Sequence, residues 1–134
     1  MLRAKMPLID RYNQARRRVA HRYNAGLSGL DLLTPLEDGI GLHVYHQYTL
    51  LSAKRDAIMA KLTERQIASA IYYPIPLHRQ QCFADKGYRG ADSVPVAEQL
   101  SAEVLSIPIF PELTEEQRQW VADSLAAFAA GKTE

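Results

Sequence analysis

Apolar residues recur at helical spacing through the first part of the chain. Five of them share one helix face because they lie four, three, four and four positions apart: Leu8, Tyr12, Ala15, Val19 and Tyr23. The pattern stops at Asn24-Ala25-Gly26, a combination typical of a helix end. Residues 1–26 are therefore predicted to form a connecting helix that packs on another element.

Residues 27–41 have the composition of a loop. Together with Gly26 they hold four glycines, and they also contain Thr34 and Pro35. Glycine and proline both interrupt regular structure. An independently folded body, residues 42–134, is expected to begin after this loop.

Three segments of this body have the pattern of strands. From 42 to 50 the alternation places five residues on one face: Leu42, Val44, His46, Tyr48 and Leu50. Residues 67–73 and residues 104–107 are short apolar runs that predict a second and a third strand.

The first helix of the body is predicted between the first two strands. Ser52 is placed to cap it, and Asp56 falls in its first turn, where the helix dipole favours an acid. Ile58 and Leu62 supply its apolar stripe, and the helix is expected to reach about Arg65.

The second helix is predicted after a polar loop over residues 79–93 that contains Gly87 and Gly90. Ser93 is its expected N-cap, and Pro95 suits its first turn, so the helix should reach about Glu103.

The last helix has the clearest signals. Thr114 and Gln117 form a capping box, and Gly131 ends the helix. Three residues line one face: Val121, Leu125 and Phe128. The order of strands and helices predicts an α/β or α+β fold, with helices flanking a small mixed or antiparallel sheet.

Composition limits the class of protein to which the chain can belong. The 134 residues fit one domain, with 47% hydrophobic and 23% charged residues, as in ordinary globular proteins. The single cysteine, Cys82, excludes an internal disulfide framework and favours a cytoplasmic setting. No apolar run approaches the ~20 residues that span a bilayer, so membrane insertion is not expected.

Charge is uneven although the net charge is only +1. Residues 1–26 hold seven Lys and Arg against Asp10, and residues 92–134 hold eight Asp and Glu against Arg118 and Lys132. The two ends should attract each other or a partner. The basic helix lacks interleaved aromatic residues and a reading-helix motif, so no nucleic-acid binding is predicted.

The segment Ile71–His78 has the sequence Ile-Tyr-Tyr-Pro-Ile-Pro-Leu-His. Pro74 and Pro76 fix their own φ angles and bias the residues before them toward extended geometry. The segment therefore predicts a rigid corner with aromatic walls.

This corner resembles a motif of the DegT-type sugar aminotransferases, in which isoleucine, histidine or tyrosine precedes Tyr-Pro-x-Pro-x-His. Other segments resemble the same family in order and spacing: residues 16–24, 42–49, 55–59, 95–98, 105–108 and 111–117. The resemblance covers nearly the whole chain, but only the C-terminal portion of the family.

The resemblance implies the small domain of an enzyme dependent on pyridoxal 5′-phosphate (PLP). Such enzymes pass an amino group from an amino acid such as glutamate to a nucleotide-linked keto sugar. The family's Schiff-base lysine and phosphate cradle lie upstream, so we assign neither to the lysines here, which are Lys5, Lys54, Lys61, Lys86 and Lys132.

The expected partners are therefore a missing N-terminal PLP domain and a second subunit in a homodimer. We interpret the chain as a C-terminal domain separated by cloning, proteolysis or a broken gene. It is expected to bind no PLP and to be inactive by itself.

Three residues are expected to position the substrate: Tyr72, Tyr73 and His78. The resemblance implies that the first two line the substrate side of the PLP pocket, although Tyr72 stands where the family usually has histidine. Along a strand they would point to opposite sides. His78 can bond a sugar hydroxyl or an adjacent carboxylate, or merely pin the loop.

Two other departures from the family concern Leu51, where an arginine is frequent, and Gln66, where the helix usually ends in glycine. A positive φ at Gln66 would cost at most about 1 kcal/mol.

No catalytic residue and no metal site is predicted. His43 and His46 point to opposite faces of a strand, and Cys82 has no activating neighbour in sequence. Tyr45, Tyr48, Trp120 and Phe128 are interpreted as core. The alternative function is a free-standing α/β module that binds a small ligand or a protein without catalysis.

Overall fold

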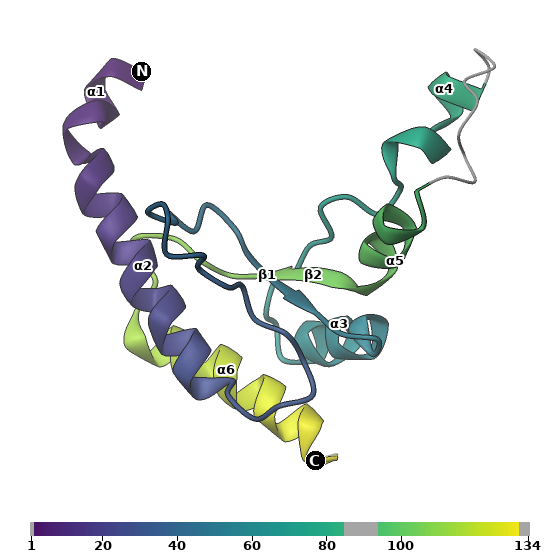
Figure 1. The fold of residues 1–134 in the computed structure, drawn as a ribbon. Coiled ribbons are helices and arrows are strands. Elements are labelled where there is room, and N and C mark those ends of the chain that lie inside the picture. The colour runs from purple at the N-terminus through teal and green to yellow at the C-terminus, as the bar shows by residue number, and fades with distance from the viewer. Residues whose placement is uncertain (1, 85–93, 132–134) are drawn as a thin grey trace.

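The computed structural model describes residues 2–84 and 94–131 (Figure 1). Its elements, in chain order, are α1 (Leu2–Lys5), a 3₁₀ turn (Met6–Leu8), α2 (Ile9–Gly26), β1 (Tyr48–Leu51), α3 (Arg55–Glu64), a 3₁₀ turn (Leu77–Arg79), α4 (Gln81–Ala84), α5 (Pro95–Glu103), β2 (Val104–Ile107) and α6 (Glu115–Ala129).

The sheet has two antiparallel strands at its centre. β1 pairs with β2 from Tyr48 opposite Ile107 to Leu51 opposite Val104. Single bridges widen the sheet on both sides, one between Leu33 and Leu51 and one between Ala70 and Ser106. This mixed α/β architecture agrees with the predicted fold class.

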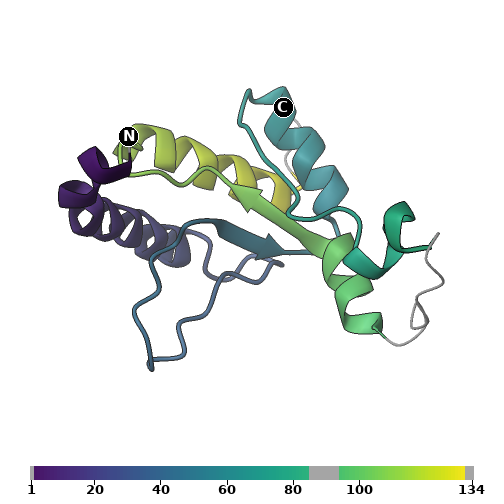
Figure 2. The ribbon, with the colours of Figure 1, turned by 90° about the horizontal axis from the view of Figure 1, so that it is seen from above.

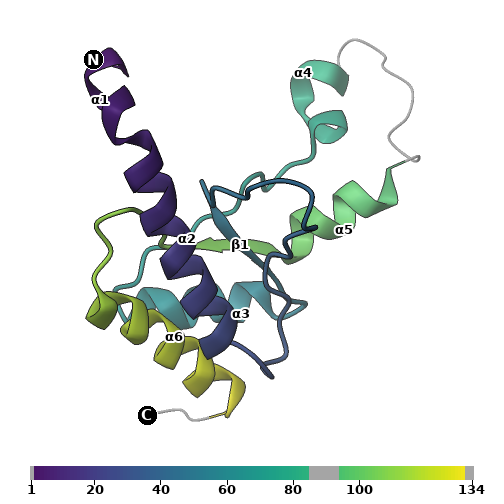
Figure 3. The ribbon, with the colours of Figure 1, turned by 60° about the vertical axis from the view of Figure 1, so that its left-hand side comes forward.

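Helices α2, α3 and α6 form the main body with the sheet. α6 packs against both α2 and α3, as Figures 1 and 3 show. Helices α4 and α5 lie at the other end of the sheet, away from α2 and α6 (Figure 2). Within the described residues, no helix is long and apolar enough to cross a membrane.

Three tyrosines form the centre of the core. Tyr23, Tyr45 and Tyr48 are each 0% exposed, and the ring of Tyr48 lies 5.1 Å from that of Tyr23 and 6.1 Å from that of Tyr45. Buried phenols need hydrogen-bond partners. The hydroxyl of Tyr23 donates to the Pro108 carbonyl at 3.0 Å, and that of Tyr48 donates to Asn24 Oδ1 at 2.5 Å.

Glu37 fastens the long loop before β1 to α2. Its carboxylate accepts hydrogen bonds from Arg17 at 3.1 Å, from the Tyr45 hydroxyl at 2.8 Å and from His21 Nε2 at 2.9 Å. These bonds lower the pKa of Glu37 to about 2, with His21 and Tyr45 contributing most. Arg17 also donates to the carbonyl of His43.

The predicted strand over 42–50 is wrong for residues 42–47. Tyr45 has a φ of 48° and is buried, whereas Leu42 is 71% exposed and Val44 37% exposed. Tyr45 donates a hydrogen bond to Glu37, and its ring centroid lies 4.2 Å from that of His43. Tyr45 is buried where an exposed residue was expected, so the alternation is interrupted before β1.

The second predicted strand, 67–73, is reduced to the bridge at Ala70. The backbone of Ala70 exchanges two hydrogen bonds with Ser106, and the chain then leaves the sheet ahead of Pro74 and Pro76. Proline lacks the N–H that a strand ladder requires, so pairing does not continue through this segment.

Two cap predictions need revision. Lys54, not Ser52, occupies the N-cap position of α3, and Ser52 Oγ accepts from the Lys54 N–H at 3.1 Å in a local turn. Ser93, the expected cap of α5, lies outside the described residues, as do Gly87 and Gly90. The observed N-cap residue of α5 is Val94, without a side-chain cap.

Other predictions are confirmed. β2 spans residues 104–107, α5 ends at Glu103, and Thr114 and Gln117 make both bonds of the capping box. Gln66 has a φ of 58°, as its position at the end of α3 requires. The attraction between the two ends is seen in an ion pair of Arg22 with Glu115.

Trp120 does not belong to the core. Its side chain is 51% exposed and lies under the guanidinium of Arg65, 5.3 Å from the ring centroid. Arg118, in the same part of α6, is buried instead: it is 6% exposed and bonded to Glu115 at 2.8 Å.

Candidate functional site

The segment 71–78 leaves the sheet after Ala70 and runs toward α4 and α5 (Figure 1). Pro76 has a φ of −57° and a ψ of 147°, the extended geometry expected for this corner. Tyr72 is 49% exposed and Tyr73 73% exposed, so both phenols are available to a ligand or to a covering surface.

Tyr72 lines an open hollow beside the sheet. The hollow measures about 340 Å³, and its walls come from residues 46–47, 68–70 and 106–110. His46 lies in this hollow together with Tyr72, although the sequence indicated only a strand residue without a metal role at His46. A wall made of an imidazole, a phenol and strand-end backbone offers several hydrogen-bonding groups to a polar ligand.

Tyr73 and His78 line a different hollow of about 280 Å³, next to α5. Its other walls include Ile75, Leu77 and Ser101. The rings of Tyr72 and Tyr73 meet edge to face, with centroids 6.2 Å apart. The structure therefore brings Tyr73 and His78 together and places Tyr72 in a neighbouring hollow.

Glu98 anchors this corner to α5. Its Oε1 atom lies 2.9 Å from His78 Nε2 and 2.9 Å from Arg79 Nε. The bonds from Arg79 and His78 hold the pKa of the Glu98 carboxyl below its usual range. Sequence reasoning used Glu98 only as part of a family motif and assigned it no role.

Two of the lysines within the described residues are engaged in ion pairs. PLP enzymes need a lysine for the Schiff base and a cradle for the phosphate. Lys54 pairs with Asp31 at 3.1 Å, and Lys61 pairs with Glu64 at 3.1 Å. Lys86 and Lys132 lie outside the described residues.

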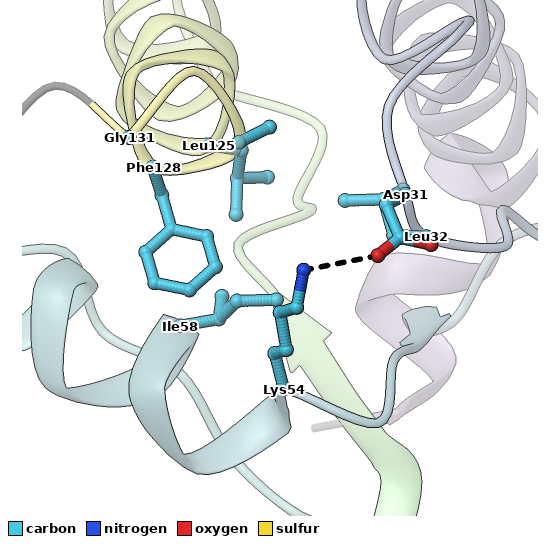
Figure 4. A pocket seen from close by; sticks show the side chains of 8 residues that line it. Asp31, Leu32, Lys54, Ile58, Leu125, Phe128 and Gly131 are labelled. Carbon is cyan, nitrogen blue, oxygen red and sulfur yellow. Dashed lines mark hydrogen bonds and ion pairs between the residues drawn. The ribbon is translucent and has the colours of Figure 1, made fainter.

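Lys54 borders a hollow of about 230 Å³ at the end of α6, shown in Figure 4. Its apolar wall comes from Ile58, Leu125 and Phe128. This hollow shares no lining residue with the hollows of Tyr72 and Tyr73.

His43 and Cys82, to which the sequence assigns no metal or catalytic role, lie in separate places. His43 Nδ1 accepts a hydrogen bond from the Tyr45 N–H at 3.1 Å. In residues 2–84 and 94–131, no three His, Cys, Asp or Glu side chains are grouped as a metal site would require. Cys82 is an exposed free thiol.

The fold is that of solved aminotransferase structures. Residues 1–126 match the sequence profile of the DegT/DnrJ/EryC1/StrS aminotransferase family. The chain belongs to this family, which confirms the resemblance seen in its sequence.

The curated relatives that the chain resembles include a sugar aminotransferase. The chain is 48% identical over 117 residues to a UDP-N-acetyl-3-dehydro-alpha-D-glucosamine 3-aminotransferase of Acidithiobacillus ferrooxidans, a match that covers 87% of this chain and 31% of the relative. It is also 44% identical over 131 residues to a pleiotropic regulatory protein of Geobacillus stearothermophilus. This match covers 96% of this chain and 35% of that protein. The chain thus spans about a third of the length of these relatives.

Solved structures of similar proteins share the fold of this chain. S. venezuelae DesV superposes with a TM-score of 0.91 at 30% identity, over 99% of this chain and 36% of DesV. The ntda protein of Bacillus subtilis, solved with bound cofactor PMP, superposes with a TM-score of 0.77 at 27% identity, over 89% of this chain and 28% of ntda.

Proposed function

We propose that this chain is the C-terminal small domain of a PLP-dependent aminotransferase that aminates a nucleotide-linked keto sugar. The observation that carries the proposal is the Tyr72–His78 corner, set on a fold that matches sugar aminotransferases along nearly its whole length. The A. ferrooxidans relative acts on a UDP-linked 3-keto sugar by its name, which supports this substrate class.

In this proposal the residues of the chain bind and orient the sugar. Tyr72, Tyr73 and His78 offer two phenols and an imidazole on a segment held by prolines, so little ordering entropy remains to be lost on binding. PLP would supply the amino-group carrier chemistry, with glutamate as the donor. The lysine and the phosphate cradle would come from a large domain outside these 134 residues.

The proposal also defines partners. The large domain and the second subunit of a homodimer would cover the exposed apolar side chains of the corner, such as Ile75 at 53% and Leu77 at 70% exposure. The 134 residues alone would neither hold PLP nor transaminate. The assembled enzyme would work in the cytoplasm.

Translation of the DNA upstream of the Met1 codon tests this proposal. We expect the reading frame, or an adjacent gene, to encode a domain with a PLP-binding lysine. A stop codon directly upstream, without such a domain nearby, would overturn the proposal in favour of a binding module without catalysis.

A further inference from the structure

Glu98 joins two segments that are 20 residues apart in the sequence. It lies in the first turn of α5, whereas both of its partners, His78 and Arg79, belong to the Leu77–Arg79 turn. The His78 side chain is 21% exposed, so its ring is largely enclosed while it makes this bond. The contact therefore fixes the ring relative to α5.

The chemistry of a carboxylate decides which nitrogen carries the hydrogen. Glu98 has a lowered pKa because of its bonds from Arg79 and His78, so the carboxylate is ionised at neutral pH. An ionised carboxylate can only accept hydrogen bonds. The Nε2 atom of His78, 2.9 Å away, must then be the donor.

The hydrogen-bonding role of His78 Nδ1 follows from that of Nε2. A neutral imidazole has one N–H donor and one acceptor nitrogen, and the partner of one nitrogen sets the role of the other. Within residues 2–84 and 94–131, the side-chain hydrogen bond found for His78 is the one from Nε2 to Glu98. In the neutral ring, Nδ1 thus keeps its lone pair.

We propose that Glu98 is a positioning residue that holds His78 with its hydrogen on Nε2 and leaves Nδ1 as an acceptor for a ligand hydroxyl. The hollow that His78 shares with Tyr73 would receive this hydroxyl. The Tyr73 hydroxyl can both donate and accept, so the pair offers one fixed acceptor and one adaptable partner. Neighbouring hydroxyls of a sugar ring fit such a pair. The nature of the ligand rests on the proposed function, whereas the tautomer does not.

Nitrogen NMR of the ¹⁵N-labelled full 134-residue chain tests the proposal, at an alkaline pH where the ring is neutral. The wild type is expected to carry its hydrogen on Nε2, with a sharp proton signal protected from exchange. In Glu98→Ala this signal should be lost, and the two nitrogens should show mixed tautomers. Alanine favours helix, so α5 should persist in this variant.

Two further variants separate positioning from general damage to α5. Glu103→Ala removes the same charge from the same helix, where Glu103 accepts a bond from Gln99 at 3.2 Å and does not contact His78. The His78 signal should be unchanged there. Glu98→Gln keeps an acceptor oxygen and should retain part of the protection.

A wild-type ring with its hydrogen on Nδ1 would overturn the proposal. So would a His78 spectrum that is the same in Glu98→Ala and in the wild type, or a signal lost equally in Glu103→Ala. Each of these results would leave the aminotransferase proposal standing. Conversely, failure to find a PLP domain would not alter the tautomer.

Discussion

The main body and the corner that carries the candidate site are stabilised in different ways. In the body, Tyr23, Tyr45 and Tyr48 are fully buried and their hydroxyls are hydrogen-bonded. In the corner, Tyr73 and Leu77 are mostly exposed, and the described link to α5 runs through one carboxylate, Glu98. The main body therefore rests on a buried, hydrogen-bonded core, while the corner leaves large side chains exposed.

The largest expected difference is between two leucines. Leu105 in β2 is 0% exposed, so Leu105→Ala should lower the free energy of unfolding by about 2–5 kcal/mol through lost burial and a cavity. Leu77→Ala, in the corner, should change it by no more than about 0.5 kcal/mol. Urea unfolding measures both, and equal losses would contradict the comparison.

The next effect concerns the start of α6. Thr114→Ala removes the side-chain acceptor of the Gln117 N–H and should cost about 1 kcal/mol. Thr63→Ala is the matched control, because the Thr63 hydroxyl only bonds back to the Met59 carbonyl within α3. Thermal unfolding should show a lower midpoint for Thr114→Ala only; an unchanged midpoint would mean that the cap is not formed in solution.

Gln66→Gly should stabilise the protein. Gln66 has a φ of 58°, a conformation in which glycine avoids the clash of a Cβ atom, so we expect a gain of about 0.5–1 kcal/mol. Gln99→Gly, inside α5, should instead lose about 1 kcal/mol. If both variants lost stability in urea, the positive φ at Gln66 would be wrong.

The smallest effect is a pH dependence in the body. The pKa of Glu37 and that of Glu115 are lowered to about 2 from 4.5, so each stabilises the fold above about pH 4.5 and loses this effect as the pH falls toward 2. Glu37→Gln should flatten this fall in unfolding experiments between pH 5 and pH 2, roughly the range set by these values. A profile as steep as that of the wild type would show that the Glu37 contacts do not persist in solution.

Elements with local signals were predicted from the sequence. The capping box of α6 and the span of β2 depend on residues close together in the chain. The strand expected over 42–50 is wrong over 42–47, where Glu37, a loop residue with no periodic signal, accepts a hydrogen bond from Tyr45. Local alternation cannot report such a contact.

The candidate site was predicted only as a group of residues. The motif indicated Tyr72, Tyr73 and His78, but their division between two hollows depends on where the chain leaves the sheet at Ala70. The role of Glu98 depends on how α5 packs beside the Leu77–Arg79 turn. Neither feature has a signature in a single sequence.

Exchange of domains tests the central claim most directly. The matched third of the A. ferrooxidans 3-aminotransferase would be replaced by this chain, and amino-sugar formation and PLP binding would be measured. We expect a chimera that binds PLP and forms the amino sugar, with activity reduced by Tyr73→Ala but not by Glu103→Ala. A chimera that binds PLP and forms no amino sugar would contradict the account.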